Sequence, residues 1–470
     1  MKDLFSDLDL HQQKIALLSE YGGEVSYHDL SIQTDFWANA VAGRNLVLTL
    51  CQNCPEAVIA YIGLMRANSV PALVHHSVSQ HHLVDITNRL NPGYILCPLD
   101  HASAFGQARV VRQRNGYVLM HRGESPAMHD QLSLLLTTSG STGSQSFVRI
   151  SRDNILSNAA SIAQSLDLRQ SDRAITTMPF SYSYGLSIIH SHLLVGASVF
   201  VTENAVVTPA FWQAVREHRV TNFGGVPFIY QTLKRLRLDT MDLPALRLLT
   251  QAGGRMDPDD IQSFVQSCAR NNRQFRVMYG QTEATARMSC VPWDAMPSKG
   301  HTIGIPIPGG SMFLIDEAGN LIQEPEQPGE LVYQGPNVSL GLAQSAEDLT
   351  LGDCHKGTLH TGDIACRDSD GFLRIIGRKK RFLKIFGHRV SLDETEHLLE
   401  RAGYHAACSG HDDRLYVFIT DADKAKDTAA FLQSATGIHQ KGIFVHAVPA
   451  FPRLESGKTD YSTLMKQALP

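Results

Sequence analysis

The chain has 470 residues, of which 43% are hydrophobic and 19% are charged, and its formal net charge is −4. This composition is typical of a globular protein, and the length predicts about three domain-sized units. The weak negative charge excludes a general attraction to nucleic acid, and no apolar run approaches the ~20 residues of a membrane-spanning helix. The N-terminus lacks the basic start and apolar core of a signal peptide, so we expect a cytoplasmic protein without membrane insertion.

Strand patterns and helical patterns alternate through the first two thirds of the chain. The first series runs strand, helix, strand, helix, strand over residues 45–50, 56–67, 69–74, 82–90 and 93–98. The same rhythm returns between residues 174 and 237. Strands that alternate with helices in this way predict an α/β architecture with a mainly parallel sheet.

The pattern of predicted secondary structure changes at about residue 300, after which short strands are separated by turn residues. Strands are predicted within 310–322, 329–335 and 359–377, with the turn sequences "EAGN" and "DSDG" between them. These hairpins predict a β-rich subdomain. A basic cluster at 377–384 follows, and a small pattern of helix, strand and helix then runs to the C-terminus.

Cysteine and histidine patterns raise the question of a redox or metal site. Cys51 and Cys54 form a CxxC after a predicted strand, which is where a thioredoxin-like motif would lie. No second CxxC completes a zinc site, so we expect two incidental thiols between a strand and a helix. The pairs His75–His76 and His81–His82 lack a neighbouring cluster of acidic or cysteine ligands, and we expect solvated loops there.

A loop rich in Gly, Ser and Thr, "SGSTGSQS" at 139–146, lies between two predicted strands. A hairpin loop of this kind exposes backbone N–H groups and hydroxyls, which suit a polyanion such as a phosphate chain. It is not a Walker loop, because the Gly-Lys-[Ser/Thr] ending is absent. By itself, the loop would more simply be an unliganded turn.

Four further segments change that interpretation. "YGQTE" at 279–283 combines an aromatic ring, a hydroxyl and a carboxylate, and "HTGD" at 360–363 places Asp363 in a tight glycine turn. The segments 377–390 and 452–460 add cations. Each has an ordinary alternative as a core residue, a turn former or a solvated charge run, but their combination in this order is hard to explain by chance.

Together these motifs resemble the adenylate-forming superfamily, which comprises acyl- and aryl-CoA synthetases, nonribosomal peptide synthetase adenylation domains and firefly luciferase. The matching segments span the chain and lie at residues 137–143, 178–199, 225–233, 251–256, 279–283, 329–342, 361–363, 377–396 and 455–458. The resemblance implies the acyl-CoA synthetase-like fold. In that fold a large N-terminal domain, here 1–379, has parallel α/β subdomains and a β-rich subdomain, and a small mobile α+β domain, here 380–470, follows a hinge near Lys380.

The resemblance also implies two half-reactions. A carboxylic acid and ATP form acyl-AMP in the presence of Mg²⁺, and the thiol of CoA or of a carrier-protein phosphopantetheine then displaces AMP. We expect a fatty, aryl or polyketide-like acid, because no Asp is placed to hold the α-amino group of an amino acid. The alternative is a catalytically weakened homologue that acts as a binding partner in a biosynthetic assembly line. No feature favours luciferase-like oxygenation.

Residue roles follow from the resemblance, position by position. Lys458 would bridge the α-phosphate and the substrate carboxylate, Thr282 would contact phosphate, and Glu283 would help to bind Mg²⁺. Tyr279 would stack on adenine, and Asp363 would hold the ribose hydroxyls with help from Arg378. The remaining predicted nucleotide-binding residues are Thr138, Ser139, Gly140, Ser141, Thr142, Gly143, Gly253, Gly254 and Gly280.

Two further groups complete the expected site. Tyr182 would be an aromatic gate to the acyl pocket, and Lys384 and Gly387 would line the pantetheine tunnel. The other predicted pocket residues are Tyr184, Gly185, Gly224 and Gly225, of which the last two would leave room for a sizeable acyl group.

The chain departs from its relatives at Ser146, which stands where the family carries a lysine. Loss of a charged hydrogen bond of about 1.5–3 kcal/mol predicts binding or rate weakened by roughly ten- to a hundredfold, not abolished adenylation. Arg149 lies three residues further on. If 147–151 is a strand, this odd offset points Arg149 to the opposite face, so we do not expect it to replace the lysine.

Overall fold

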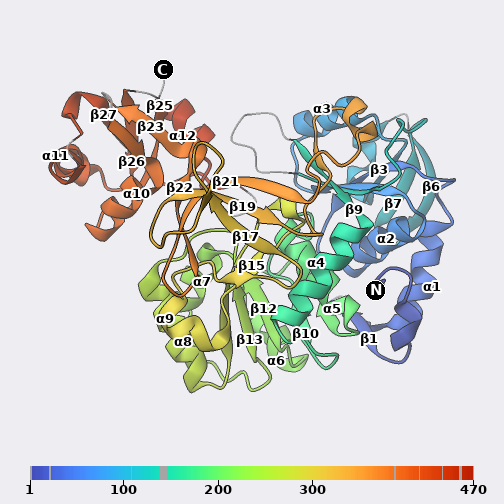
Figure 1. Ribbon diagram of the computed structural model, residues 1–470. Helices are drawn as coiled ribbons and strands as arrows, with labels where there is room; N and C mark the ends of the chain where they lie inside the picture. The colour runs from blue at the N-terminus through green and yellow to red at the C-terminus, as the bar shows by residue number, and fades with distance from the viewer. Residues whose placement is uncertain are drawn as a thin grey trace. The chain divides into compact units, whose positions relative to one another are not determined.

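The structure of the protein is a computed structural model (Figure 1). The chain forms two compact units. Unit 1 comprises Met1–Thr138, Gln145–Ser311 and Gln334–Leu359, and unit 2 comprises Ser139–Ser144, Met312–Tyr333 and His360–Pro470. The structure describes all residues except 1–2, 21–22, 107, 138–145, 386–387, 412, 437, 455–457 and 469–470. No helix in these described segments is long and apolar enough to cross a bilayer.

The first sheet of unit 1 has eight strands and contains the predicted parallel series. Its order is β20 (Gly341–Ala343), β9 (Phe147–Ser151), β8 (Leu132–Thr137), β4 (Val70–His75), β3 (Leu46–Cys51), β5 (Tyr94–Pro98), β7 (Tyr117–His121) and β6 (Arg109–Arg114). Strands β3, β4, β5 and β8 pair in parallel, and β9 pairs antiparallel with β8. Every residue of β3 is buried, as expected of a parallel strand covered on both faces.

The second sheet of unit 1 has nine strands. Its order is β16 (Ile305–Pro306), β15 (Ser289–Cys290), β14 (Gln274–Tyr279), β13 (Leu248–Gln251), β12 (Asn222–Gly225), β10 (Arg173–Ile175), β11 (Ser198–Phe200), β1 (Ile15–Leu18) and β2 (Val25–Ser26). Strands β10 to β14 pair in parallel, which confirms the prediction of a parallel sheet in this region.

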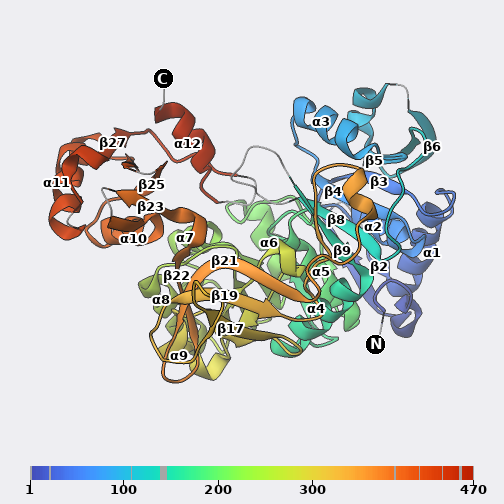
Figure 2. The same ribbon diagram turned by 45° about the horizontal axis from the view of Figure 1, so that its top comes forward.

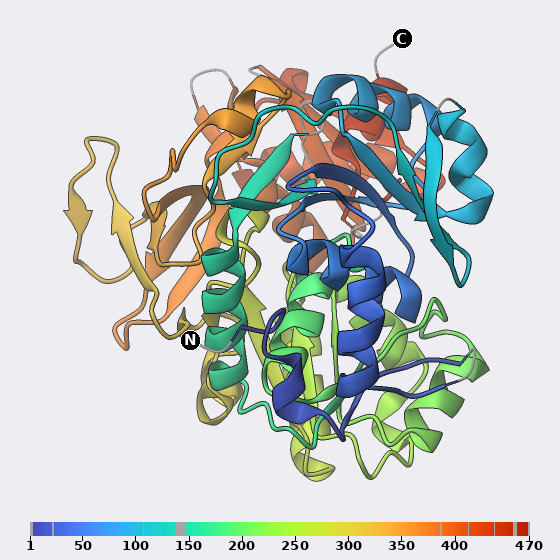
Figure 3. The same ribbon diagram turned by 90° about the vertical axis from the view of Figure 1, so that its right-hand side faces the viewer.

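Helices connect and cover these two sheets. They are α1 (Tyr27–Ala38), α2 (Pro55–Arg66), α3 (Gln80–Leu90), α4 (Arg152–Ser165), α5 (Ser183–Leu194), α6 (Pro209–Glu217), α7 (Pro227–Arg235), α8 (Pro258–Arg270) and α9 (Met296–Lys299). One hydrophobic core joins side chains of both sheets to α2, α4 and α5, so these helices lie between the sheets (Figure 3). Helix α5 is buried along its whole length.

Unit 2 contains the predicted hairpins. Its five-stranded sheet has the order β18 (Leu321–Ile322), β17 (Ser311–Ile315), β19 (Gly329–Gln334), β21 (Thr358–Arg367) and β22 (Leu373–Arg378), and β17 and β21 begin in the part of the chain that belongs to unit 1. These strands confirm the predicted change to β-rich structure.

The C-terminal part of unit 2 is built on a three-stranded sheet of β25 (Ala406–His411), β26 (Arg414–Ile419) and β27 (Ile443–Ala447) (Figure 2). Because side chains alternate along β26, Leu415, Val417 and Ile419 pack with α10 (Leu392–Arg401) and α11 (Ala425–Thr436). The intervening Tyr416 and Phe418 pack with α12 (Tyr461–Ala468). A hairpin of β23 (Phe382–Ile385) and β24 (His388–Ser391) precedes this sheet.

Candidate active site

The "YGQTE" motif lies at the carboxyl end of the parallel strand β14. After Tyr279 the chain turns through the short 3₁₀ helix Thr282–Ala284 and returns as β15, and the N–H of Met288 donates to the Tyr279 carbonyl at 2.8 Å. A Cβ on Gly280 would lie 1.7 Å from the Ala286 carbonyl oxygen, so only glycine permits this reversal. The motif therefore lies at the carboxyl ends of the parallel strands, where open α/β folds bind their ligands.

Two polar side chains of this turn are the ones predicted to bind phosphate and metal. The hydroxyl of Thr282 lies 3.0 Å from the hydroxyl of Ser183, in the first turn of α5. Glu283 is half-buried, and its carboxylate has no hydrogen bond or ion pair with any residue that the structure describes. A carboxylate that remains available beside a hydroxyl is the kind of oxygen donor set that Mg²⁺ prefers, so these residues fit the expected metal.

The predicted gate and pocket tyrosines lie together with the predicted nucleotide glycines. The Tyr184 hydroxyl donates to the Thr250 carbonyl at 2.8 Å, and the Tyr182 and Tyr184 ring centroids are 6.5 Å apart. A Cβ on Gly253 would lie 2.8 Å from the Tyr182 hydroxyl, and Gly253 itself has a φ of +81°. Both considerations favour glycine at this position. Gly254 accepts a 2.8 Å hydrogen bond from the side chain of Gln251.

The three pocket glycines have different reasons to be glycine. A Cβ on Gly185 would lie 2.3 Å from the Pro179 carbonyl oxygen, so Gly185 lets α5 approach the preceding turn. Gly224 and Gly225 lie close to side chains of the protein itself. A Cβ on Gly224 would lie 2.7 Å from the Tyr184 hydroxyl, and a Cβ on Gly225 would lie 2.9 Å from the Ile229 side chain. These two glycines make room for Tyr184 and Ile229, and the size of the acyl group that fits beside them stays a prediction.

Asp363 and Arg378 form a pair within unit 2. The Arg378 Nε donates to the Asp363 Oδ1 at 2.9 Å, and Asp363 is only 2% exposed. The two residues are also register partners in β21 and β22. Asp363 lies inside a strand and not in the expected tight turn, although the preceding Gly362 has a φ of +67°. The two predicted ribose-binding residues are therefore positioned by one β ladder and one ion pair.

The predicted residues of the C-terminal segment are placed only in part. Lys458 lies in a loop closed by an antiparallel bridge between Arg453 and Thr459, and its carbonyl accepts from the Leu454 N–H at 2.8 Å. Lys384 pairs with Arg389 across the β23–β24 hairpin. The hinge residue Lys380 lies in a short 3₁₀ helix, Lys379–Arg381. Gly387 lies outside the described residues.

The predicted phosphate loop also lies outside the described residues, from Thr138 to Gly143, but its two flanks are described. Thr137 and Phe147 are register partners in the antiparallel pair β8–β9, which confirms a hairpin connection. Arg149 is fully buried, and its guanidinium donates to the carbonyls of Leu340 and Leu342 at 2.8 and 3.1 Å. It also donates to the carbonyls of Leu351 and Gly352. The Arg149 guanidinium thus joins β9 to β20 and to residues 351–352. It is not available to the loop, as its odd offset along the strand predicted.

The thiols and histidines outside this region do not form a metal site in the part of the chain that the structure describes. Cys51 is buried and Cys54 is half-buried, neither forms a disulfide, and burial raises the pKa of the Cys54 thiol to about 11. Thiols of raised pKa are poor nucleophiles and metal ligands at neutral pH. The incidental role of the CxxC stays a prediction.

Arg287 is a candidate site residue that the sequence patterns did not reveal. It is 2% exposed, and its guanidinium carbon lies 4.7 Å from the centre of the Tyr184 ring. The only signal was a single arginine in the otherwise small and apolar run "ATARMSC" that follows the motif. No sequence periodicity connects this position to Tyr184, which lies about a hundred residues earlier in the chain.

The chain belongs to the AMP-binding enzyme family, because the model of that family matches residues 5–343. Among solved structures it is similar to o-succinylbenzoate CoA synthetase from Bacillus subtilis in complex with an acyl-adenylate, with 18% identity, a TM-score of 0.78, and 99% and 98% of the two chains covered. ATP-bound MatB from Rhodopseudomonas palustris has 19% identity and a TM-score of 0.80, with 99% of both chains covered. These structures confirm the predicted acyl-CoA synthetase-like fold.

Curated relatives share more of the sequence over shorter stretches. Oxalate–CoA ligase from Arabidopsis thaliana is 29% identical over 57% of this chain and 52% of its own length. L-proline–[L-prolyl-carrier protein] ligase from Streptomyces coelicolor is 28% identical over 72% of this chain and 66% of its own length. Malformin synthetase from Aspergillus homomorphus is 27% identical over 73% of this chain, which spans only 7% of that protein.

Proposed function

We propose that this chain is an acid–thiol ligase that uses ATP to activate a carboxylic acid as acyl-AMP and then forms a thioester. The observation that carries the proposal is the 3.0 Å contact between the hydroxyls of Thr282 and Ser183. It joins the "YGQTE" turn to the helix that begins beside Tyr182 and Tyr184. This contact supports the proposal that the phosphate-binding group and the acyl pocket adjoin each other, as a reaction between an acid and ATP requires.

In the first half-reaction, one oxygen of the substrate carboxylate attacks the α-phosphorus, and the bond to the pyrophosphate leaving group breaks. Two anions must approach each other, so the site has to supply positive charge and fixed hydrogen-bond donors. Lys458 would supply the charge, and Thr282 would hold a phosphate oxygen. Mg²⁺ held by Glu283 would neutralise part of the triphosphate charge.

In the second half-reaction, a thiol sulfur attacks the carbonyl carbon of acyl-AMP, and AMP leaves with the bonding electron pair. The thiol belongs to CoA or to the phosphopantetheine of a carrier protein, and it would reach the carbonyl between Lys384 and Gly387. Rotation of residues 380–470 about Lys380 would move Lys458 away from the reacting atoms and bring the pantetheine tunnel lined by Lys384 and Gly387 to them. Support comes from the family membership and from CoA and carrier-protein ligases among the relatives. We also propose a cytoplasmic location.

The test is ATP-dependent hydroxamate formation with a panel of fatty, aryl, polyketide-like and dicarboxylic acids, followed by CoA and carrier protein as acceptors. The variant Lys458→Ala is expected to lose acyl-AMP formation by about a hundredfold or more, because it removes a charge that acts on the transition state. It should still form thioester from supplied acyl-AMP. Lys466→Ala, in the exposed part of α12, is the control and should retain both steps. Equal loss of both steps in Lys458→Ala would contradict the assignment of Lys458 to the first half-reaction alone.

A second candidate is a weakened homologue that acts as a binding partner in an assembly line. It is favoured by Ser146 at the lysine position and by Arg149, whose guanidinium is fully engaged with backbone carbonyls and cannot replace that lysine. Absence of hydroxamate and of pyrophosphate exchange with every acid in the panel would favour this candidate over the ligase.

A further inference from the structure

Arg287 places a cation against Tyr184, which the sequence predicts to line the acyl pocket. Its guanidinium carbon lies 4.7 Å from the centre of the Tyr184 ring, and its Nη1 lies 3.2 Å from the sulfur of Met278. Tyr184 is held in position in turn, because its hydroxyl bonds to both the carbonyl and the hydroxyl of Thr250. The cation thus lies on the face of a ring that cannot move aside easily.

The guanidinium of Arg287 has no anion and no oxygen acceptor among the residues that the structure describes. Its Nε is buried without a partner, and its one hydrogen bond goes to a thioether, which is a weak acceptor. The titratable groups nearest to it are neutral at pH 7, because burial raises the pKa values of Tyr184 and Tyr230, and that of Cys290 to about 11.

The environment of the Arg287 guanidinium differs from that of two other buried arginines of unit 1, which have structural roles. Arg149 donates to four backbone carbonyls, and Arg273 donates to the carbonyls of Met241 and Leu243 at 3.3 Å. Arg149 therefore replaces the lost hydration of its charge with protein oxygens. Arg273 does so in part, because its Nε is also buried without a partner. Arg287 has no such replacement from described residues, although taking an unpaired charge out of water is very unfavourable.

The backbone around Arg287 is fixed by buried amides. The Asn158 and Asn337 side chains donate to the Arg287 carbonyl at 2.7 and 3.2 Å, and Asn337 also donates to the Ala284 carbonyl at 2.9 Å. Thr285 donates to the carbonyl of Asn337 at 2.7 Å. The guanidinium is therefore presented from a rigid turn, and such preorganisation favours its use as a binding group.

We propose that Arg287 determines substrate specificity by binding a second anionic group of the acid, so that the substrate is a carboxylic acid with a further carboxylate at its distal end. This inference rests on the proposed function and narrows its substrate class. One carboxylate reacts with ATP, and the other accepts hydrogen bonds from Arg287 and remains unchanged. A guanidinium presents several donors in a fixed fork, which suits a carboxylate. The bound anion would supply the acceptors that Arg287 lacks.

The test compares acids of equal carbon number that differ only in the distal group: butanoate with succinate, pentanoate with glutarate, and hexanoate with adipate. Hydroxamate formation at pH 8, where both carboxylates are ionised, gives kcat/KM for each acid. The wild-type protein is expected to favour the diacid of at least one pair. Arg287→Met is expected to lower kcat/KM for that diacid by about 10- to 100-fold, mainly through KM, and to leave the monoacid unchanged or improved.

Arg273→Met is the matched control, because it removes another buried guanidinium that lies outside the predicted pocket. It should leave the ratio of kcat/KM for the diacid to kcat/KM for the monoacid unchanged. Activity of Arg287→Met on monoacids would show that the variant folds. If it does not fold, Arg287→Lys replaces it and should lower the ratio through loss of the planar fork. Monoacids activated as well as diacids by the wild type would overturn this inference and leave the ligase function standing. No reaction with any acid would overturn the ligase function, and the inference with it.

Discussion

Ser146 and Arg149 lie three residues apart and have separate consequences for the phosphate loop. Ser146 cannot provide the positive charge that the family resemblance predicts at its position. Arg149 carries such a charge, but its guanidinium is occupied by carbonyls of β20 and of the segment after it. We propose that the loop holds phosphates through N–H groups and hydroxyls, with charge supplied from elsewhere, and we expect weak binding of the pyrophosphate portion of ATP.

The variant Ser146→Lys tests this expectation. It should raise ATP affinity or the adenylation rate by about 10- to 100-fold, because a charged hydrogen bond to phosphate contributes about 1.5–3 kcal/mol. The measurement is the ATP dependence of pyrophosphate exchange with the best acid. Ser146→Met, of similar length without charge, is the control. No gain from lysine would mean that the loop has compensated for the missing charge by another route.

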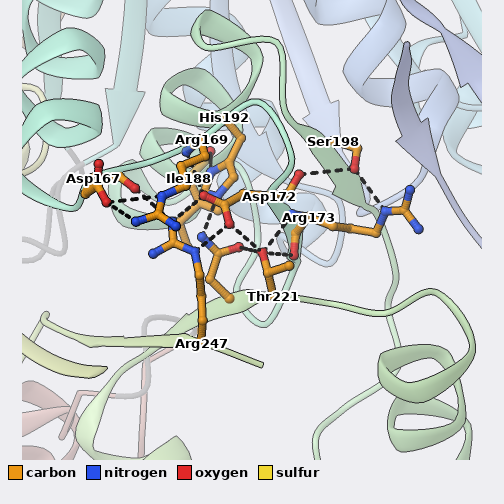
Figure 4. Close-up of polar contacts among 10 residues, drawn as sticks. Asp167, Arg169, Asp172, Arg173, Ile188, His192, Ser198, Thr221 and Arg247 are labelled. Carbon is orange, nitrogen blue, oxygen red and sulfur yellow. Dashed lines mark hydrogen bonds and ion pairs between the residues drawn. The ribbon is translucent and has the colours of Figure 1, made fainter. Parts of the chain in front are cut away.

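At the scale of elements, the two ends of the nine-stranded sheet have different roles. The residue before each of three parallel strands joins one polar network at their amino ends: Asp172 before β10, Thr221 before β12 and Arg247 before β13 (Figure 4). Arg247 Nε donates to Asp172 at 2.7 Å, and the Thr221 hydroxyl donates to it at 3.0 Å. The candidate site lies at the carboxyl ends of the same sheet, so this network can hold the strands in register without occupying the site.

Asp172→Asn is expected to lower the free energy of unfolding by about 2 kcal/mol, because Asp172 is 2% exposed and its loss leaves Arg247 without its carboxylate. Urea denaturation followed by circular dichroism gives the change. Asp167→Asn breaks an ion pair with Arg169 in which both side chains are mostly exposed, and should cost less than about 0.5 kcal/mol. Similar losses in the two variants would contradict a stabilising role for the buried network.

The same network predicts a pH dependence of stability. Burial alone would raise the pKa of Asp172, but the hydrogen bonds and charge of Arg247, with further donors from Arg169 and Thr221, lower it below 3.8. A lowered carboxyl pKa stabilises the fold fully above the unfolded value, and this contribution is lost as the pH falls through the folded value. The stability difference between wild type and Asp172→Asn should therefore stay constant from pH 8 to 5 and shrink below about pH 4.

At the scale of the whole molecule, the chain divides into two units whose boundary is not a single point in the sequence. Unit 2 combines the C-terminal segment with residues 312–333 and 360–378. Strands of the latter two stretches pair in one five-stranded sheet, and the C-terminal segment forms sheets of its own. The boundary expected to move during the reaction, at Lys380, lies in the short 3₁₀ helix that follows β22 of the five-stranded sheet. Division into domains 1–379 and 380–470 stays a prediction.

The variant Lys380→Pro tests the hinge, because proline restricts the backbone φ angle that a rotation has to change. We expect adenylation to be retained and thioester formation to fall by about tenfold or more, equal to ~1.4 kcal/mol in the barrier. Single-turnover assays of each half-reaction separate the two effects. Lys380→Ala keeps the backbone free and should behave as the wild type. Equal slowing of both half-reactions by proline would argue against a hinge at this residue.

The sequence by itself determined the order and type of the main elements and the kind of chemistry. Buried strands such as β3 are continuous apolar runs, and the helices between them have their own periodicity, so both could be predicted from neighbouring residues. The orientation of Arg149 away from the loop also followed from strand alternation alone. The motif order identified the family, which the match over residues 5–343 confirms.

Only the tertiary structure decided what lies beside the predicted pocket glycines and which charges lack partners. The space at Gly224 is taken by Tyr184 and Thr250, which come from other segments, and Arg378 meets Asp363 only because β21 pairs with β22. Arg287 becomes a buried cation on the face of Tyr184 because the turn after β14 folds back beside α5. Such contacts depend on the packing of residues far apart in the chain, which local periodicity does not encode.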